Sequence, residues 1–200
     1  MNQIIKNTII LFVITLVAGI CLGTVHDITL DPMAQEAAAT KTYQEVYPDA
    51  ASFDEPQELA DAVTAAADSI SEWGFGKVTI NDAKEALDAS GNQIGYLITS
   101  TSAESYGGNV QIAVGITNEG ELTGIGFLSI SDTPGLGMRA KEPDFKDQFI
   151  GKKAENLEVT KTGASADNQI EAISGATITS KAVTNATDAA IYFVANCLAQ

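Results

Sequence analysis

The chain has 200 residues, 45% hydrophobic and 18% charged, which is enough to bury one core beneath an ordinary globular surface. All 26 acidic residues and ten of the eleven basic ones follow His26, so the chain beyond that residue has a net charge of −16. A surface this acidic repels the phosphate backbone of nucleic acids. We therefore expect no nucleic-acid partner.

An uncharged, strongly apolar stretch of 19 residues runs from Asn7 to Val25. At about 1.5 Å per residue, a helix of this length spans about 28 Å, close to the thickness of a hydrocarbon core. A cleaved signal peptide fits less well, because the stretch is long and no small-x-small cleavage site precedes Val25. A lipoprotein signal at Cys21 fits less well still, because Ile20 stands where a small residue is required. The sequence therefore predicts a single transmembrane helix in a lipid membrane.

The charges beside this stretch predict its orientation. Lys6 precedes the stretch, whereas His26 and Asp27 follow it. By the positive-inside rule, the N-terminus then lies in the cytoplasm and the acidic remainder is extracytoplasmic. The predicted division is a cytoplasmic N-terminus, a transmembrane helix, a juxtamembrane helix with its connector, and a globular domain, at residues 1–6, 7–25, 26–56 and 57–200.

The globular part shows signals for both helices and strands. Helical spacing of apolar residues predicts helices at residues 31–47, 57–73 and 179–196, the last of them capped by Thr179 or Ser180. Alternation and turn signals predict strands at residues 77–80, 93–102, 110–117, 122–130 and 157–160. The expected fold class is α+β, a mainly antiparallel sheet with helices packed on one side.

Four small or hydroxyl-bearing residues stand just before the last predicted helix: Ser174, Gly175, Ala176 and Thr177. The two small residues leave room for a phosphate to approach the backbone, and the hydroxyl of Thr179 lies nearby in the chain. Free N–H groups and the positive end of the helix dipole favour an anion at such a point. The pattern indicates a phosphate site, and an ordinary Gly-containing turn is the alternative.

This run resembles the flavinylation motif of the membrane-anchored FMN-binding subunits of two respiratory complexes, the Rnf complex and the sodium-pumping NADH:quinone reductase. The resemblance implies that a separate flavin transferase uses FAD as donor and esterifies Thr177 with FMN. The family pattern has Asp three residues before the Ser, where this chain has Glu171. The resemblance thus implies an FMN-binding domain over residues 57–200.

Two further segments resemble the same family, in the same order along the chain. Residues 132–137, Asp-Thr-Pro-Gly-Leu-Gly, are similar to its Thr-Pro-Gly-Leu-Gly loop, and residues 106–108 are similar to its Tyr-Gly-Gly segment. Pro134-Gly135 is a strong turn signal, and Gly137 would let the backbone come close to a flat ring. Besides the flavinylation motif, the predicted FMN-binding residues are Thr179, Tyr106, Gly107, Thr133, Gly135 and Leu136.

Three neighbouring side chains have two interpretations each. Tyr106 could stack on the flavin ring or simply pack. Arg139, with Met138 beside it, could lie near the polar edge of the flavin, or it could be a solvated charge.

Neither Cys21 nor Cys197 has the spacing of a metal ligand, and no hydrolytic set of residues accompanies the single histidine, so we expect no metal and no catalytic residue.

The resemblance implies an electron-carrying subunit, most like the G subunit of the Rnf complex, an ion-translocating ferredoxin:NAD oxidoreductase. The cofactor would be covalent FMN, and the partners would be the other subunits of the complex and the flavin transferase. The chain is not expected to be a complete enzyme alone. The alternatives are an FMN subunit of a sodium-pumping NADH:quinone reductase-like complex and a non-redox, membrane-anchored module that binds a phosphorylated ligand.

Overall fold

The fold is taken from a computed structural model that describes residues 2–29, 32–153 and 156–198. Contacts divide the chain into two compact units, Met1–Thr40 and Lys41–Gln200. The second unit contains all three segments that resemble the flavin-binding family.

The first unit is helical. Helix α1 (Asn2–Thr29) includes the whole predicted span, and α2 (Pro32–Val46) begins in this unit. The apolar side chains of residues 9–14 and of Leu16 are 47–64% exposed, and at about 3.6 residues per turn they lie on every side of α1. Counting only the residues that the structure describes, no helix is both long and apolar enough to cross a membrane. The stretch is helical, but the predicted transmembrane helix is not confirmed and stays a prediction.

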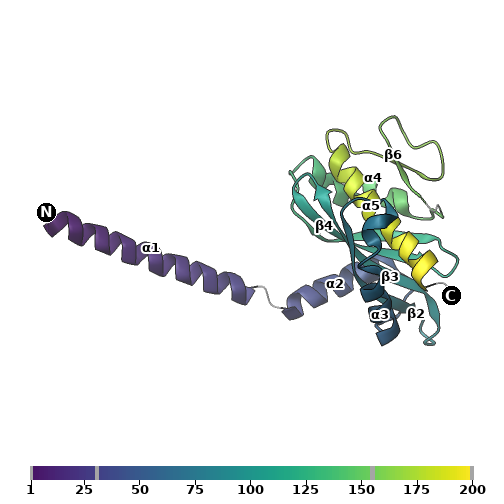
Figure 1. The fold of residues 1–200 in the computed structure, drawn as a ribbon, viewed down its shortest axis with the longest axis horizontal. Coiled ribbons are helices and arrows are strands. Elements are labelled where there is room, and N and C mark those ends of the chain that lie inside the picture. The colour runs from purple at the N-terminus through teal and green to yellow at the C-terminus, as the bar shows by residue number, and fades with distance from the viewer. Residues whose placement is uncertain (1, 30–31, 154–155, 199–200) are drawn as a thin grey trace. The chain divides into compact units, whose positions relative to one another are not determined.

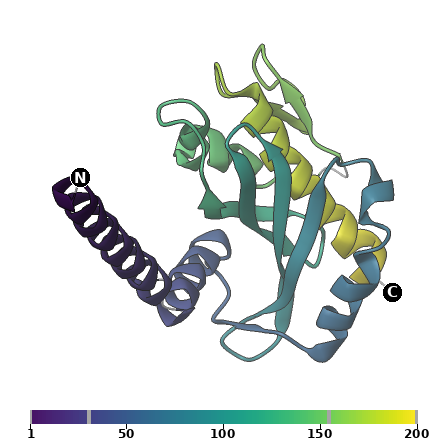
Figure 2. The same cartoon turned by 60° about the vertical axis from the view of Figure 1, so that its left-hand side comes forward.

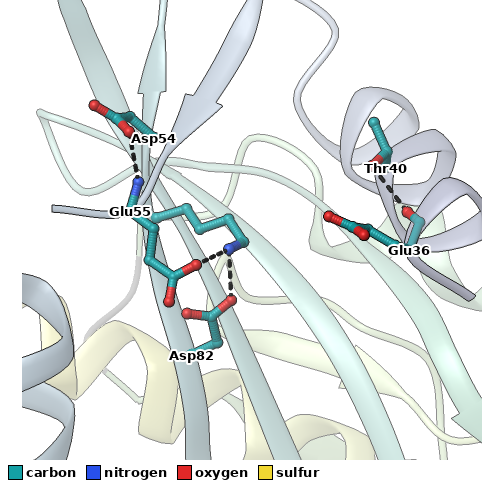
Figure 3. Close-up of polar contacts among 6 residues, drawn as sticks. Glu36, Thr40, Asp54, Glu55 and Asp82 are labelled. Atoms are coloured by element: carbon teal, nitrogen blue, oxygen red, sulfur yellow. Dashed lines mark hydrogen bonds and ion pairs between the residues drawn. The ribbon is translucent and has the colours of Figure 1, made fainter. Parts of the chain in front are cut away.

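The second helix agrees with the predicted range of residues 31–47, although Asp31 lies outside the described residues. Within α2, the hydroxyl of Thr40 donates to the carbonyl of Glu36 at 2.9 Å, as Figure 3 shows. This is the usual bond of a helical threonine with the carbonyl four residues earlier, and it satisfies the hydroxyl without a partner outside the helix.

The second unit is built on one antiparallel sheet with strand order β1-β2-β3-β4-β5 (Figures 1 and 2). Each strand pairs with its neighbour in the chain, and short turns connect β2 to β3, β3 to β4 and β4 to β5. Longer chain with helical elements lies between β1 and β2. The turn before β5 is the predicted one, with Gly120 at φ 79° and its N–H bonded to the carbonyl of Thr117. The strands are β1 (Ser52–Asp54), β2 (Val78–Leu87), β3 (Gln93–Ser105), β4 (Gly108–Thr117) and β5 (Leu122–Ile130).

Strand β2 is longer than the sequence predicts. The alternation of apolar residues stops at Ile80, but the strand continues for seven residues to Leu87. The pairing with β3 shifts between Ile80 and Asp82, which is a bulge that changes the faces on which later side chains lie. A bulge breaks the period-2 pattern, so the second half of the strand has no clean signal in the sequence.

The predicted helix over residues 57–73 is two elements. Helix α3 (Gln57–Ala66) ends early, and a single 3-10 turn, η1 (Ile70–Trp73), follows it. Both the N–H and the hydroxyl of Ser69 donate to the carbonyl of Ala66, at 3.0 and 3.1 Å. Because these bonds close a tight turn at the carbonyl that would otherwise continue the helix, they end it there.

Helix α5 (Thr177–Phe193) lies along one face of the sheet, as Figures 1 and 2 show. It begins two residues before the predicted start and is followed by a π-helical turn, Val194–Leu198. The buried hydroxyl of Ser100 on β3 donates to the carbonyl of Ala186 at 2.9 Å and ties the middle of the helix to the sheet. Large residues of β3, β4 and α5 form the main core: Ile98, Ile112, Val114, Val183 and Phe193.

The opposite face of the sheet is also covered, which corrects the prediction that helices pack on one side alone. Val46, at the end of α2, packs with Leu97 and Ala113 in a second cluster of buried residues. Tyr47 is 2% exposed, and its hydroxyl donates to the carbonyl of Ile94 at 2.8 Å. Helix α2 has little apolar surface except near this end, so its role in covering the sheet has no clear signal in the sequence.

A lysine on β2 joins the sheet to the segment before α3. The amine of Lys84 lies 2.6 Å from a carboxylate oxygen of Glu55 and 2.9 Å from one of Asp82 (Figure 3). Burial alone lowers the pKa of Lys84, but the hydrogen bonds to the two carboxylates outweigh it and hold the pKa above its usual value. The lysine is therefore charged at neutral pH and links β2 to the residue that follows β1.

The segment between β5 and α5 contains short elements: η2 (Gly137–Lys141), α4 (Pro143–Lys146), η3 (Asp147–Phe149), β6 (Glu158–Thr160) and β7 (Gln169–Glu171). Strands β6 and β7 pair in parallel as a separate two-stranded sheet, and the sequence analysis predicted only the first of them. Just before β6, the N–H of Leu157 donates to the carboxylate of Asp188 on α5 at 2.8 Å. This bond fixes the small sheet to the main helix.

Asp188 is 2% exposed, and burial raises its pKa to about 7 from a usual value of 3.8. Because the folded value lies above the unfolded one, this group costs stability as pH rises through that window, and the full cost is present above pH 7. Asp188→Asn keeps an oxygen for the Leu157 N–H but carries no charge. We expect the variant to be more stable than the wild type by about 1–4 kcal/mol at pH 8.

The measurement is urea unfolding of the full chain in detergent micelles at pH 8 and pH 4, with wild type and variant compared at each pH. The stability difference should shrink toward zero at the lower pH. An equal difference at both values would contradict the assignment of a raised pKa to Asp188.

Candidate functional site

The three segments singled out in the sequence meet at the carboxylate of Asp132, which follows β5. The hydroxyl of Thr179, in the first turn of α5, donates to Oδ2 of Asp132 at 2.6 Å. The hydroxyl of Ser105, at the end of β3, donates to the same oxygen at 2.8 Å. The backbone N–H of Thr133 donates to Oδ1 at 2.7 Å, and the N–H of Gly107 also bonds the carboxylate. The side chain of Asp132 thus joins the start of α5, the hairpin between β3 and β4, and the loop after β5.

Asp132 is ionised at neutral pH. Its partial burial alone raises its pKa, but the bonds from Thr179, Thr133, Ser105 and Gly107 outweigh burial and hold the pKa below the usual value. Hydrogen bonds to a charged acceptor are roughly twice as strong as neutral ones. The carboxylate is therefore a firm attachment point for three otherwise separate pieces of chain.

The loop after Asp132 has the turn that the sequence predicts. The N–H of Leu136 donates to the carbonyl of Thr133 at 3.1 Å, with Pro134 second in the turn and Gly135 third. Gly135 has φ 75°, which a type II turn requires at its third position and which glycine adopts without strain.

Gly137 has a different neighbour from the flat ring proposed for it. A Cβ at this position would lie 2.2 Å from the carboxyl carbon of Asp132 and within 2.5 Å of both its oxygens. Gly137 is buried, and the four donors to the carboxylate of Asp132 hold it at this position. The glycine therefore makes room for Asp132 itself.

The hydroxyls in the flavinylation motif and those just after it differ in their bonding. Thr179 donates to Asp132, and Ser180 donates to the carbonyl of Ala176 while accepting from the N–H of Ile173. Both side chains are fully buried, so they are inside the helix start and are not the predicted cap. Among the described residues, no group bonds the hydroxyl of Ser174 or of Thr177. These two hydroxyls remain available to a ligand.

Thr177 is the first residue of α5, and Ala176 before it is the N-cap, with no side-chain bond to the helix. The first backbone N–H groups of a helix have no partner within it. No described residue accepts a bond from the N–H groups of residues 177–179. A half-buried threonine hydroxyl thus stands beside unpaired donors at the positive end of a 17-residue helix, which fits a phosphate.

Large apolar side chains lie exposed on the same segments. Tyr106 is 72% exposed, Leu136 is 43% exposed and Ile178 is 54% exposed. Leu136 approaches the motif closely, because a Cβ at Gly175 would lie 3.1 Å from its Cδ2. Apolar groups beside a phosphate-type site suit a ligand with an aromatic part as well as a phosphate.

The predicted site residues on the three segments are therefore brought together. Three further residues that the sequence analysis discussed make their contacts elsewhere. Met138 is partly buried and packs against the main core, so it is a core residue. Arg139 lies 3.2 Å from a carboxylate oxygen of Glu142 and is a surface ion pair. Glu171 has an exposed side chain on β7, and its backbone bonds Gln148.

The sequence analysis gave no role to Asp132 or Ser105. Asp132 stands directly before the Thr-Pro-Gly-Leu-Gly loop, and an acidic residue before a turn was the available signal. Ser105 carries no such signal, because a serine at the end of a strand is common. Only the fold shows that both face the first turn of α5.

A cavity of about 150 Å³ lies elsewhere in the second unit, between the end of α2, β5 and the segment after it. It is smaller than most ligand sites, and none of the predicted site residues lines it. Among the described residues, no group of acidic, histidine or cysteine side chains could hold a metal ion. The candidate site is therefore the exposed surface at the start of α5.

The chain matches one protein family and is similar to several known proteins. The FMN-binding domain family matches residues 105–192, from Ser105 to near the end of α5. The G subunit of the Na⁺-translocating ferredoxin:NAD⁺ oxidoreductase complex of Acetobacterium woodii is 35% identical over 203 residues, covering 96% of this chain and 92% of the relative. The G subunit of the proton-translocating ferredoxin:NAD⁺ oxidoreductase complex of Clostridium ljungdahlii is 35% identical over 126 residues, covering 58% of this chain and 67% of the relative.

Among solved structures, the crystal structure of NqrC from Shewanella oneidensis aligns with a TM-score of 0.46 and 19% identity, covering 56% of this chain and 54% of that chain. The sequence matches define a protein with an FMN-binding domain. At 35% identity over nearly its whole length, the chain belongs to the family of G subunits of ion-translocating, Rnf-type ferredoxin:NAD oxidoreductase complexes. The resemblance seen in the three motifs is thereby confirmed.

The packing of Gly137 against Asp132 gives a testable consequence. Gly137→Ala places a methyl group where the carboxylate lies, so we expect a loss of about 1–3 kcal/mol in the free energy of unfolding. In an Asp132→Ala background the space is open, and the same change should cost much less. Urea unfolding of the two single variants, the double variant and the wild type measures this coupling. Simple additivity of the two losses would contradict the contact.

Proposed function

We propose that the chain carries FMN attached covalently through a phosphoester to Thr177 and passes electrons within an ion-translocating ferredoxin:NAD oxidoreductase complex. The observation that carries the proposal is the pair of free hydroxyls at the start of α5. Thr179 and Ser180 are committed to buried bonds, whereas Thr177 is half-buried, unbonded among the described residues and first in the helix. Membership in the G-subunit family supports the cofactor and the complex.

The residues fit the phosphate end of FMN. The N–H groups at the start of α5 and the helix dipole stabilise an anion, and Ser174 offers a second free hydroxyl on the exposed side. Gly175, at φ 79°, turns the chain into the helix. These groups would hold a phosphate of FMN in place while the ester bond prevents its loss.

The residues also fit the ring end. The exposed side chains of Tyr106 and Leu136 offer apolar surface beside the motif, and Gly107, Thr133 and Gly135 give that surface its shape. When bound, FMN would supply one- and two-electron redox chemistry. The chain itself would orient the ring and exclude water from one side of it.

Membership in the family supports a proposal about assembly and location. The other subunits of the complex would be the partners of the second unit, and a flavin transferase would act on it during maturation. We further propose the division predicted from the sequence, with residues 1–6 cytoplasmic, residues 7–25 in the inner or plasma membrane, residues 26–56 as connector and residues 57–200 as the extracytoplasmic FMN-binding domain. The apolar composition of residues 7–25 and the position of Lys6 support it.

The attachment site has a direct test. Thr177→Val keeps the size and β-branching of the side chain but removes the oxygen nucleophile, so it should abolish covalent flavin while leaving the fold intact. Thr177→Ser should retain part of the label. The readout is flavin fluorescence of the denatured protein on a gel, after coexpression of the full chain with a flavin transferase.

Two matched controls accompany this test. Ser174→Ala removes the other free hydroxyl and should keep the label. Asn185→Ala alters a half-buried polar residue two turns further along α5 and should also keep it. Loss of flavin from Ser174→Ala with retention in Thr177→Val would place the ester on Ser174, and an unlabelled wild type would contradict the electron-carrier proposal.

The orientation has a separate test. Protease added to cells whose outer layer has been removed or made permeable should digest the chain beyond residue 26 while leaving cytoplasmic proteins intact. The physical reason is the positive-inside rule applied to Lys6. Full protection of the acidic domain would contradict the proposed topology. Release of the intact protein by a carbonate wash would contradict the membrane span.

A further inference from the structure

The carboxylate of Asp132 does not belong to the flavinylation motif, yet it contacts the turn in which the motif ends. Thr179 is two residues after Thr177, and both lie in the first turn of α5. The Thr179 hydroxyl is fully buried and directed to Oδ2 of Asp132 at 2.6 Å, a shorter bond than those from Ser105 and Thr133 to the same carboxylate. The bond therefore fixes the rotation of this turn about the helix axis.

We propose that Asp132 is the positioning residue for flavin transfer, holding the Thr177 hydroxyl in the orientation that the transferase requires. The proposal rests on the function assigned above. In the transfer, the Thr177 oxygen forms a bond to the FMN phosphorus of FAD and the P–O bond of the pyrophosphate breaks. AMP leaves with the bonding pair, and the hydroxyl proton goes to a base on the transferase.

The rest of the network supports positioning over simple stability. Ser105 Oγ and the N–H of Gly107 hold the same carboxylate from the hairpin, and the N–H of Thr133 holds it from the loop. Asp132 thus sets the distance between the helix start and both loops that would lie around the ring. The four donors keep its pKa low, so the carboxylate is charged at every pH at which transfer would be measured.

The middle of α5 has an independent attachment, which supplies a control. Ser100 on β3 bonds the carbonyl of Ala186 at 2.9 Å, more than two turns after Thr177. Ser100→Ala removes one buried bond between the sheet and the same helix without touching the first turn. A loss of helix stability alone would therefore affect Ser100→Ala and the Asp132 variants alike.

The experiment measures transfer of FMN from FAD to purified, unlabelled full chain in detergent micelles, with the transferase limiting and the acceptor chain varied in concentration. Asp132→Asn and Thr179→Val should each lower kcat for the acceptor about tenfold to hundredfold, because a misplacement near 1 Å costs that much in an oriented reaction. KM should stay within about threefold, since the docking surface is otherwise retained. Ser100→Ala should keep the wild-type kcat even if its melting temperature falls by as much as that of the Asp132 and Thr179 variants.

The double variant Asp132→Asn/Thr179→Val sharpens the result. Because both changes remove or weaken the same contact between Asp132 and Thr179, the double variant should be no slower than the slower single variant by more than about twofold. Wild-type kcat in both single variants, or an equal kcat loss in Ser100→Ala, would overturn the positioning role. If the wild type itself takes no FMN, the proposed function fails. If the wild type is labelled at Thr177 and the Asp132 variants are labelled equally fast, only the positioning role fails.

Discussion

The hydrogen bonds to the carboxylate of Asp132 are the constraint on which the arrangement of the site depends. Ser105, Thr133 and Thr179 come from three segments that are far apart in the sequence, and each donates to the same side chain. Without a charged acceptor at this point, the hairpin, the loop and the helix start would have no common polar partner. Residue 137 must then be a glycine, because the Cβ of any larger residue would occupy the space of the Asp132 carboxylate.

The rest of the fold holds the three segments around Asp132 in place. The antiparallel sheet supplies the hairpin between β3 and β4 and the end of β5, and α5 lies across one face of it (Figure 2). Ser100 and Asp188 attach the helix further along, on the sheet and on the segment before β6. The start of α5 can therefore remain exposed, with unpaired N–H groups, because the rest of the helix is buried.

The sequence predicts the sheet well where the alternation is uninterrupted. Strand β5 has the predicted bounds, whereas the prediction of β2 stops at residue 80, because a bulge at residue 81 interrupts the alternation. The three-residue strands β1 and β7 were not predicted. The predicted helix over residues 57–73 is interrupted near Ser69, whose hydroxyl bonds the carbonyl of Ala66 in place of a helical partner. The spacing of apolar residues does not reveal such a bond. Of the site, Thr177 and the two loops were identified from motifs, but Asp132 and Ser105 gain their role only through contacts between distant segments.

The central claim is that Thr177 carries the flavin. Thr179 and Ser180 are committed to buried bonds, and of the two free hydroxyls only that of Thr177 lies in the first turn of α5. Tryptic digestion of the coexpressed wild-type chain should release the peptide of residues 162–181, which contains Ser174, Thr177, Thr179 and Ser180. Tandem mass spectrometry of that peptide tests the claim most directly. The account predicts the mass of FMN on Thr177 alone. The mass of FMN on Ser174, Thr179 or Ser180, or an unmodified peptide, would contradict it.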